Sequence, residues 1–124
     1  MNAISAPWRM AYITGENPDG CVLCDRDNRC REWVLQGGEH AYVMMNLYPY
    51  TTGHLMVAPA RHVARLEDLS PEEKTAIFDL VVTSVAALKN AMKPDGLNIG
   101  MNLGRAAGAG VEDHLHVHIV PRWN

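Results

Sequence analysis

Histidines and aliphatic residues alternate along the segment 114–119, where three histidines are each followed by Leu115, Val117 or Ile119. Successive side chains of a β-strand point to opposite faces, so this pattern predicts a strand over 114–121 with its aliphatic face in the core. The imidazoles would line the other face. Imidazole titrates near neutral pH, attacks phosphorus and binds metals. The histidine face of this strand is therefore the first candidate for a functional site.

A helical period occupies the middle of the chain. Ser70 at the N-cap, Pro71 at the first helical position and Glu73 at the third form a capping box. Apolar or small residues then recur at helical spacing, at Ile77, Leu80, Val81, Ser84, Leu88, Ala91 and Met92. The segment 93–96, with a proline and a glycine, ends the pattern. We therefore expect a helix of about 22 residues that packs one apolar stripe on a sheet.

Four further segments have the composition of strands: 33–36, 40–46, 54–59 and 97–103. Gly37 and Gly38 separate the first two, which predicts a hairpin whose turn permits positive φ. With 114–121 these segments make a mainly antiparallel five-stranded sheet. One main helix beside such a sheet places the protein in the α+β fold class.

Length and composition limit the kind of protein. A chain of 124 residues, 48% hydrophobic and 20% charged, is expected to form one domain. The net charge of −3 offers no electrostatic footprint for duplex nucleic acid, so no nucleic-acid partner is expected. We find no uninterrupted apolar run of about 18 residues, and residues 1–8 lack the apolar core of a signal peptide. The expectation is a cytoplasmic protein without a membrane partner.

Three cysteines are too few for a disulfide scaffold. Cys21 and Cys24 have the spacing of one half of a tetrahedral zinc site, and the other half needs two imidazoles or thiolates from elsewhere. The alternative is two thiols without a metal. Cys30 fits no such spacing. The segment 1–30 is thus expected to be an N-terminal segment that carries half of a metal site.

A glycine-rich segment, 104–110, precedes the histidines. Its small residues, above all Gly108, Ala109 and Gly110, leave backbone N–H groups accessible to an anion. The glycine spacing matches neither a Walker A loop nor a dinucleotide fingerprint. Taken alone, the segment is more typical of a plain hairpin loop than of an anion site, and its position next to the histidines is what favours phosphate binding.

The alternating histidines of 114–120 resemble the signature of the histidine triad (HIT) superfamily. The segments 46–50, 53–59 and 96–104 and the capped helix follow in the order that this family shows. Residues 6–12 extend the resemblance to bacterial HIT proteins of the diadenosine tetraphosphate phosphorylase type. The resemblance implies one HIT domain over 1–124, with a five-stranded, mainly antiparallel sheet, one long helix and one short helix.

The resemblance also implies a covalent mechanism. His116 would attack the α-phosphate of a nucleotide and become nucleotidylated, while its other ring nitrogen is held by the carbonyl of His114. His118 would donate a hydrogen bond to a phosphate oxygen, and His54 would support the nucleophile. The family implies no catalytic metal.

Binding residues follow from the same resemblance. Asn46 would hold the ribose, Asn102 would meet the phosphates, and the amides of Gly108, Ala109 and Gly110 would stabilise charge in the transition state. A structural zinc ion, one per chain, would be held by four ligands, which are Cys21, Cys24, His62 and His114. The family further implies a homodimer, or a larger even oligomer.

The substrate class expected from the resemblance is a nucleotide or dinucleoside polyphosphate, cleaved by phosphorolysis. Hydrolysis of the same substrates and nucleoside phosphoramidate cleavage are the alternatives. Nucleoside phosphoramidases and diadenosine triphosphate hydrolases of this family usually carry Gln-Ser or Gln-Thr before the histidines, where this chain has Ala109 and Gly110. The difference makes these two activities less favoured. Two different classes stay open: a zinc-dependent hydrolase in which the three histidines bind a catalytic metal, and a nucleotide-binding module without catalysis.

Overall fold

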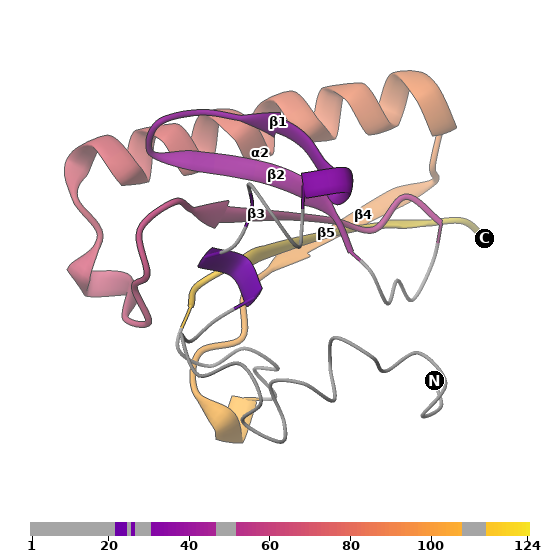
Figure 1. Cartoon of the computed structure of the whole chain (residues 1–124). Helices are drawn as coiled ribbons and strands as arrows, with labels where there is room; N and C mark the ends of the chain where they lie inside the picture. Colours follow the sequence, from indigo (N-terminus) through magenta and orange to yellow (C-terminus); the bar gives the residue numbers. More distant parts are fainter. Residues whose placement is uncertain (1–21, 25, 27–30, 47–51, 108–113) are drawn as a thin grey trace.

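The computed structural model describes residues 22–24, 26, 31–46, 52–107 and 114–124. A five-stranded sheet has the order β1-β2-β3-β5-β4, and every neighbouring pair is antiparallel (Figure 1). Its strands are β1 (Val34–Gly37), β2 (Ala41–Met45), β3 (Leu55–Pro59), β4 (Gly96–Gly100) and β5 (Val117–Arg122). With one long helix beside this sheet, the predicted α+β class is confirmed.

Helix α2 (Pro71–Met92) has the predicted length of 22 residues and covers one face of the sheet (Figure 1). Both hydrogen bonds of the capping box at Ser70 and Glu73 form, and Lys93 ends the helix in the left-handed conformation. By length and composition alone, α2 is apolar enough to cross a membrane. Its charged residues interrupt the apolar sequence, so the sequence pattern did not indicate a membrane span. Its buried stripe belongs to the core cluster of the sheet, as in the core helix of a globular domain.

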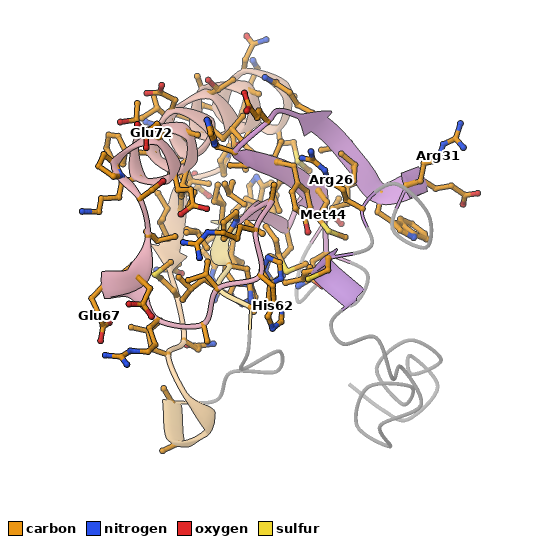
Figure 2. The ribbon with its side chains drawn as sticks, turned by 60° about the vertical axis from the view of Figure 1, so that its left-hand side comes forward. Arg26, Arg31, Met44, His62, Glu67 and Glu72 are labelled. Atoms are coloured by element: carbon orange, nitrogen blue, oxygen red, sulfur yellow. The ribbon has the colours of Figure 1, made fainter. Side chains whose placement is uncertain are left out.

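The two faces of the sheet have separate apolar clusters. Leu115, Val117 and Ile119 pack with α2 on one face, as the alternation predicts. On the other face, Leu23 of the short turn η2 (Val22–Cys24) covers Met44 and its neighbours. In Figure 2, Met44 lies inside the fold. The segment that carries Cys24 is therefore held against the face of the sheet opposite to the helix.

Two expectations about strand ends and turns are wrong. The predicted hairpin of β1 and β2 forms, but its turn has no positive φ at Gly37 or Gly38. A Cβ at Gly38 would lie 3.3 Å from the carbonyl oxygen of Ala41, a tight contact that a larger residue could make only if this backbone shifted slightly. Strand β4 ends at Gly100 and not at residue 103.

Strand β5 begins at Val117 and not at residue 114. The backbone N–H of Leu115 donates to the carbonyl of Val63, at 2.8 Å, in the connection that follows β3. The segment 114–116 therefore lies against this connection before the regular ladder begins. Residue 114 therefore lies outside the strand, and this contact with the connection after β3 sets the direction of the His114 side chain.

Candidate active site and metal centre

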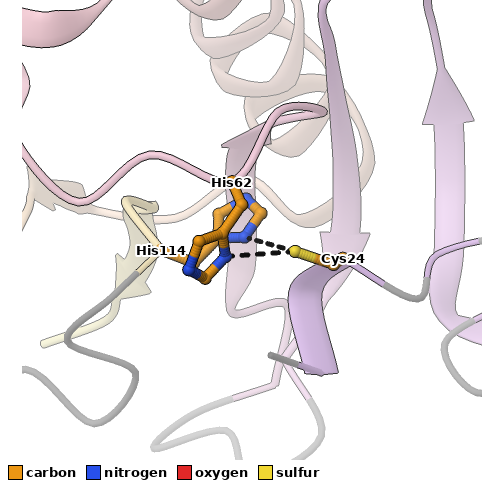
Figure 3. Close-up of side chains that lie close together, drawn as sticks. All are labelled: Cys24, His62 and His114. Atoms are coloured by element: carbon orange, nitrogen blue, oxygen red, sulfur yellow. Dashed lines mark hydrogen bonds between the residues drawn. The ribbon is translucent and has the colours of Figure 1, made fainter. Parts of the chain in front are cut away.

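A thiol and two imidazoles meet at one end of the sheet, on the face opposite to α2. Cys24 Sγ lies 3.1 Å from His62 Nδ1 and 3.4 Å from His114 Nδ1 (Figure 3). The three ligand atoms lie within 4.8 Å of one another. In tetrahedral zinc, Zn–S bonds of about 2.3 Å and Zn–N bonds of about 2.0–2.1 Å put sulfur and nitrogen about 3.6 Å apart. The cluster therefore fits a zinc ion both in its donor atoms and in its spacing.

The second nitrogen of His114 fixes the direction of this ring. His114 Nε2 donates to the carbonyl oxygen of Pro59 at 2.8 Å, so a neutral ring presents its lone pair at Nδ1, toward Cys24. Burial is the main cause that lowers the pKa of His114 to about 4, which keeps the ring neutral. A hydrogen bond from the outer ring nitrogen to a backbone carbonyl is typical of histidines that bind zinc.

A buried carboxylate anchors the segment that carries His62. Arg61, the preceding residue, donates from Nε and Nη2 to the two oxygens of Glu73, at 2.9 and 2.8 Å, and also to the carbonyl of Asp68. The Glu73 side chain is 6% exposed, and its pKa is lowered to about 2, mainly by the hydrogen bond from Arg61. The N-terminal turn of α2 thus holds the backbone beside His62.

His116 has one ring nitrogen committed to the backbone. Its Nδ1 lies 3.0 Å from the carbonyl oxygen of His114, and a carbonyl only accepts, so Nδ1 carries the proton. Burial lowers the pKa of His116, and the hydrogen bond to His114 partly opposes this effect. The unprotonated Nε2 of this neutral ring has the lone pair that a nucleophile needs.

His118 is linked to His54, the residue that directly precedes strand β3. His54 Nε2 lies 2.9 Å from His118 Nδ1, and the amide nitrogen of Asn46 makes its shorter ring contact, 3.1 Å, with His54 Nδ1. The same amide nitrogen lies 3.3 Å from His54 Nε2, and from its shorter contact we assign Nδ1 as the acceptor and Nε2 as the donor to His118 Nδ1. His118 then carries its proton on Nε2. The ring that results is a hydrogen-bond donor beside His116, with ring centroids 4.7 Å apart.

The pKa values of His54, His114, His116 and His118 are all lowered, first by burial, which favours the neutral ring near pH 7. The pKa of His118 falls to about 4, mainly through burial and then through the neighbouring rings of His116 and His54. The pKa of His54 is also lowered, first by burial and then by the charge of Arg122. Each ring therefore carries one proton, which is the condition for the assignments above.

Most of the predicted site residues within the described chain come together. His54, His114, His116 and His118 form one group, and His114 also joins Cys24 and His62. His54 contacts His118, so any support for His116 passes through that ring. The amide of Asn46 contacts His54, and Asn102 is exposed beyond β4. The expectations for Cys21, Gly108, Ala109 and Gly110 lie outside the described residues.

Sequence reasoning missed the partnership of Arg61 and Glu73. The structure pairs the guanidinium of Arg61 with the buried carboxylate of Glu73. The available signal was the capping-box glutamate, since the capping hydrogen bond uses only Oε1 and leaves Oε2 for a partner, here Arg61 Nε.

Residues 30–124 match the HIT domain family. The chain is 46% identical over 90 residues to "AP-4-A phosphorylase" of Mycobacterium tuberculosis, a match that covers 73% of this chain and 46% of that protein. It is 41% identical over 78 residues to "Bis(5'-nucleosyl)-tetraphosphatase [asymmetrical]" of Schizosaccharomyces pombe, covering 63% of this chain and 42% of that protein. The chain spans about half the length of the curated relatives it matches.

Solved structures of HIT family proteins also match the fold of this chain. A HIT family protein from Bacillus anthracis superimposes with a TM-score of 0.78 and 31% identity, covering 86% of this chain and 75% of that one. The strand order, the helix and the histidine cluster are thus found in a chain whose sequence and fold both match one family. The protein belongs to the HIT family.

Proposed function

We propose that this protein is a nucleotidyl transferase or hydrolase that acts on the α-phosphate of dinucleoside polyphosphates through a nucleotidyl-His116 intermediate. The observation that carries the proposal is the hydrogen bond from His116 Nδ1 to the carbonyl of His114, because it leaves Nε2 as the basic nitrogen. The names of the mycobacterial and yeast relatives support the substrate class.

The proposed reaction has two steps. In the first, His116 Nε2 forms a bond to the α-phosphorus of diadenosine tetraphosphate, the bond to the bridging oxygen breaks, and ATP leaves. His118, which presents an N–H on Nε2, donates to a phosphate oxygen as negative charge moves toward the leaving group. In the second, an acceptor oxygen attacks the same phosphorus and releases His116.

The proposed acceptor is inorganic phosphate, which gives ADP. The observation that favours phosphorolysis is the 46% identity to a relative named as a phosphorylase. Hydrolysis, which gives AMP, is the alternative, and a relative named as a tetraphosphatase represents it. Cleavage of nucleoside phosphoramidates, which the sequence also left open, is a second alternative.

A zinc-dependent hydrolase built on the three alternating histidines is less consistent with the geometry. Of the three, His114 is the one whose ring lies with Cys24 and His62 in the described metal-ligand cluster. His116 instead uses Nδ1 for a backbone carbonyl. We therefore propose a structural zinc held by Cys24, His62, His114 and Cys21, which would stabilise the fold and not enter the reaction.

We also propose a homodimer. Strand β4 is an edge of the described sheet, and Ile99 on it is 51% exposed. Phe78 and Val82 on the outer surface of α2 are 67% and 52% exposed. Apolar surface at a sheet edge is usually covered by a second chain. Light scattering at micromolar concentration should give twice the mass of the chain, and a stable, fully active monomer would refute this assembly.

The deciding experiment for the function is turnover of diadenosine tetraphosphate with and without millimolar phosphate, with products separated by chromatography. Strong dependence on phosphate, with ADP and ATP as products, supports phosphorolysis. Release of AMP and ATP without phosphate supports the hydrolytic alternative. Absence of any cleavage and of any labelled protein after incubation with labelled substrate would overturn the proposed function.

A further inference from the structure

Strand β5 continues beyond the histidines on the face opposite to α2. Val117 and Ile119 pack with the helix cluster, so the alternate positions, including His118 and Arg122, belong to the other face. Four residues of a strand place the Cα atoms of His118 and Arg122 about 13 Å apart. One face therefore presents a nucleophile, a hydrogen-bond donor and a cation in order along the chain.

The guanidinium of Arg122 is held in a defined direction. Its Nε donates to Asn98 Oδ1 of the neighbouring strand β4 at 2.8 Å. Leu97 of β4 packs against the helix-side cluster, which puts Asn98 on the same face as Arg122. Arg122 is exposed, and the Nη groups donate to no described residue. Two nitrogen atoms with several N–H donors thus remain for a ligand.

The surface around this cation is open. On β4, Gly100 pairs with His118 and Gly96 pairs with Arg122. A Cβ at either glycine would meet no atom within 4 Å. Edge strand β4 therefore leaves space above the backbone between the histidines and the arginine. The charge of Arg122 also lowers the pKa of His54, which places the guanidinium within electrostatic reach of the histidine group.

We propose that Arg122, oriented by Asn98, binds the polyphosphate of the leaving group and so selects substrates with a charged chain beyond the α-phosphate. This inference rests on the proposed function. In an in-line displacement the leaving oxygen departs opposite to the attacking His116 Nε2. On this face, His118 and then Arg122 follow His116 along the chain, so Arg122 lies beyond the hydrogen-bond donor on the side away from the nucleophile. Planar guanidinium groups bind phosphate oxygens with two parallel hydrogen bonds.

The test measures binding, so that it does not depend on turnover. In the His116→Asn background, affinities for AMP and for diadenosine tetraphosphate are measured by calorimetry, with and without Arg122→Gln. AMP has no phosphate beyond the α position, so its affinity should stay unchanged. The affinity for the dinucleotide should fall about tenfold, and the loss should shrink at high salt. Asn98→Ala should cause a smaller loss of the same kind.

Arg65→Gln is the matched control, because Arg65 is an exposed arginine paired with Glu67 away from the histidines. It should change neither affinity. Equal loss of AMP and dinucleotide affinity in Arg122→Gln, or no loss at all, overturns the inference. Failure of the proposed function has a different signature, since neither nucleotide would then bind to the protein with Arg122 intact.

Discussion

Two groups of side chains meet at His114, and they are assembled in different ways. Cys24, His62 and His114 come from segments 38 and 90 residues apart. His116 and His118 come from alternate positions on one face of one segment, and His54 reaches them from the position just before the neighbouring strand β3. The first group exists only once the connection after β3 and the turn η2 are in place. The second group is largely a property of an extended chain.

His114 serves both groups with different atoms. Its ring faces Cys24 and Pro59, while its carbonyl oxygen accepts the proton of His116. The side chain thus belongs to the proposed metal centre, and the backbone belongs to the proposed active site. We infer that loss of the thiol–imidazole cluster would act first on stability, and loss of the nucleophile on rate.

The largest expected effect is on the rate. His116→Asn removes the proposed nucleophile, and turnover of diadenosine tetraphosphate should fall about a thousandfold or more, with an unchanged melting temperature. His40→Asn is the control, since His40 lies in the turn between β1 and β2 and is not part of the histidine group. A His116→Asn protein that keeps most of its rate would contradict covalent catalysis.

The thiol–imidazole cluster should show the reverse behaviour. Metal analysis of protein prepared without chelator should give about one zinc per chain. Cys24→Ser should then lower the melting temperature by roughly 10 °C, because a structural metal contributes folding free energy. The rate constant of the folded fraction should change far less. Cys30→Ser is the control, and protein without bound zinc would refute the metal centre.

A smaller effect is expected where the cluster depends on the Arg61–Glu73 pair. Arg61→Gln should weaken metal binding about tenfold, because the backbone at His62 loses its anchor to the N-terminus of α2. Competition with a chromophoric chelator measures this affinity. Arg65→Gln, which removes an exposed pair with Glu67 in the same connection, should leave it unchanged. Equal losses in the two variants would show that the anchor has no specific role.

A further expected effect is a pH dependence of stability. The pKa of Glu73 falls from 4.5 to about 2 in the folded protein, so its stabilising contribution is complete above pH 4.5 and is lost as the pH falls toward 2. Urea unfolding of wild type and Glu73→Gln should differ near neutral pH and converge in acid. Glu67→Gln should show little of this behaviour, because its carboxylate is exposed and screened. A difference that is constant with pH would exclude this linkage.

Local patterns predicted most of the elements. The bounds of α2 follow from a capping box and a left-handed C-cap, both of which depend on residues adjacent in the chain. The aliphatic positions 115, 117 and 119 lie in the core because of the two-residue period of a strand. The start of β5 was misplaced, because a hydrogen bond between Leu115 and the distant Val63 directs the chain there.

What the sequence by itself determined is therefore the set of elements, the face on which each histidine lies and, through a family resemblance, the residues of the candidate sites. Only the tertiary structure decided which nitrogen of each ring carries the proton. His54 is assigned by Asn46, His116 by a backbone carbonyl and His114 by Pro59. The physical reason is that a neutral imidazole has two tautomers of similar energy, and the hydrogen-bond partner that the fold brings to one nitrogen selects between them.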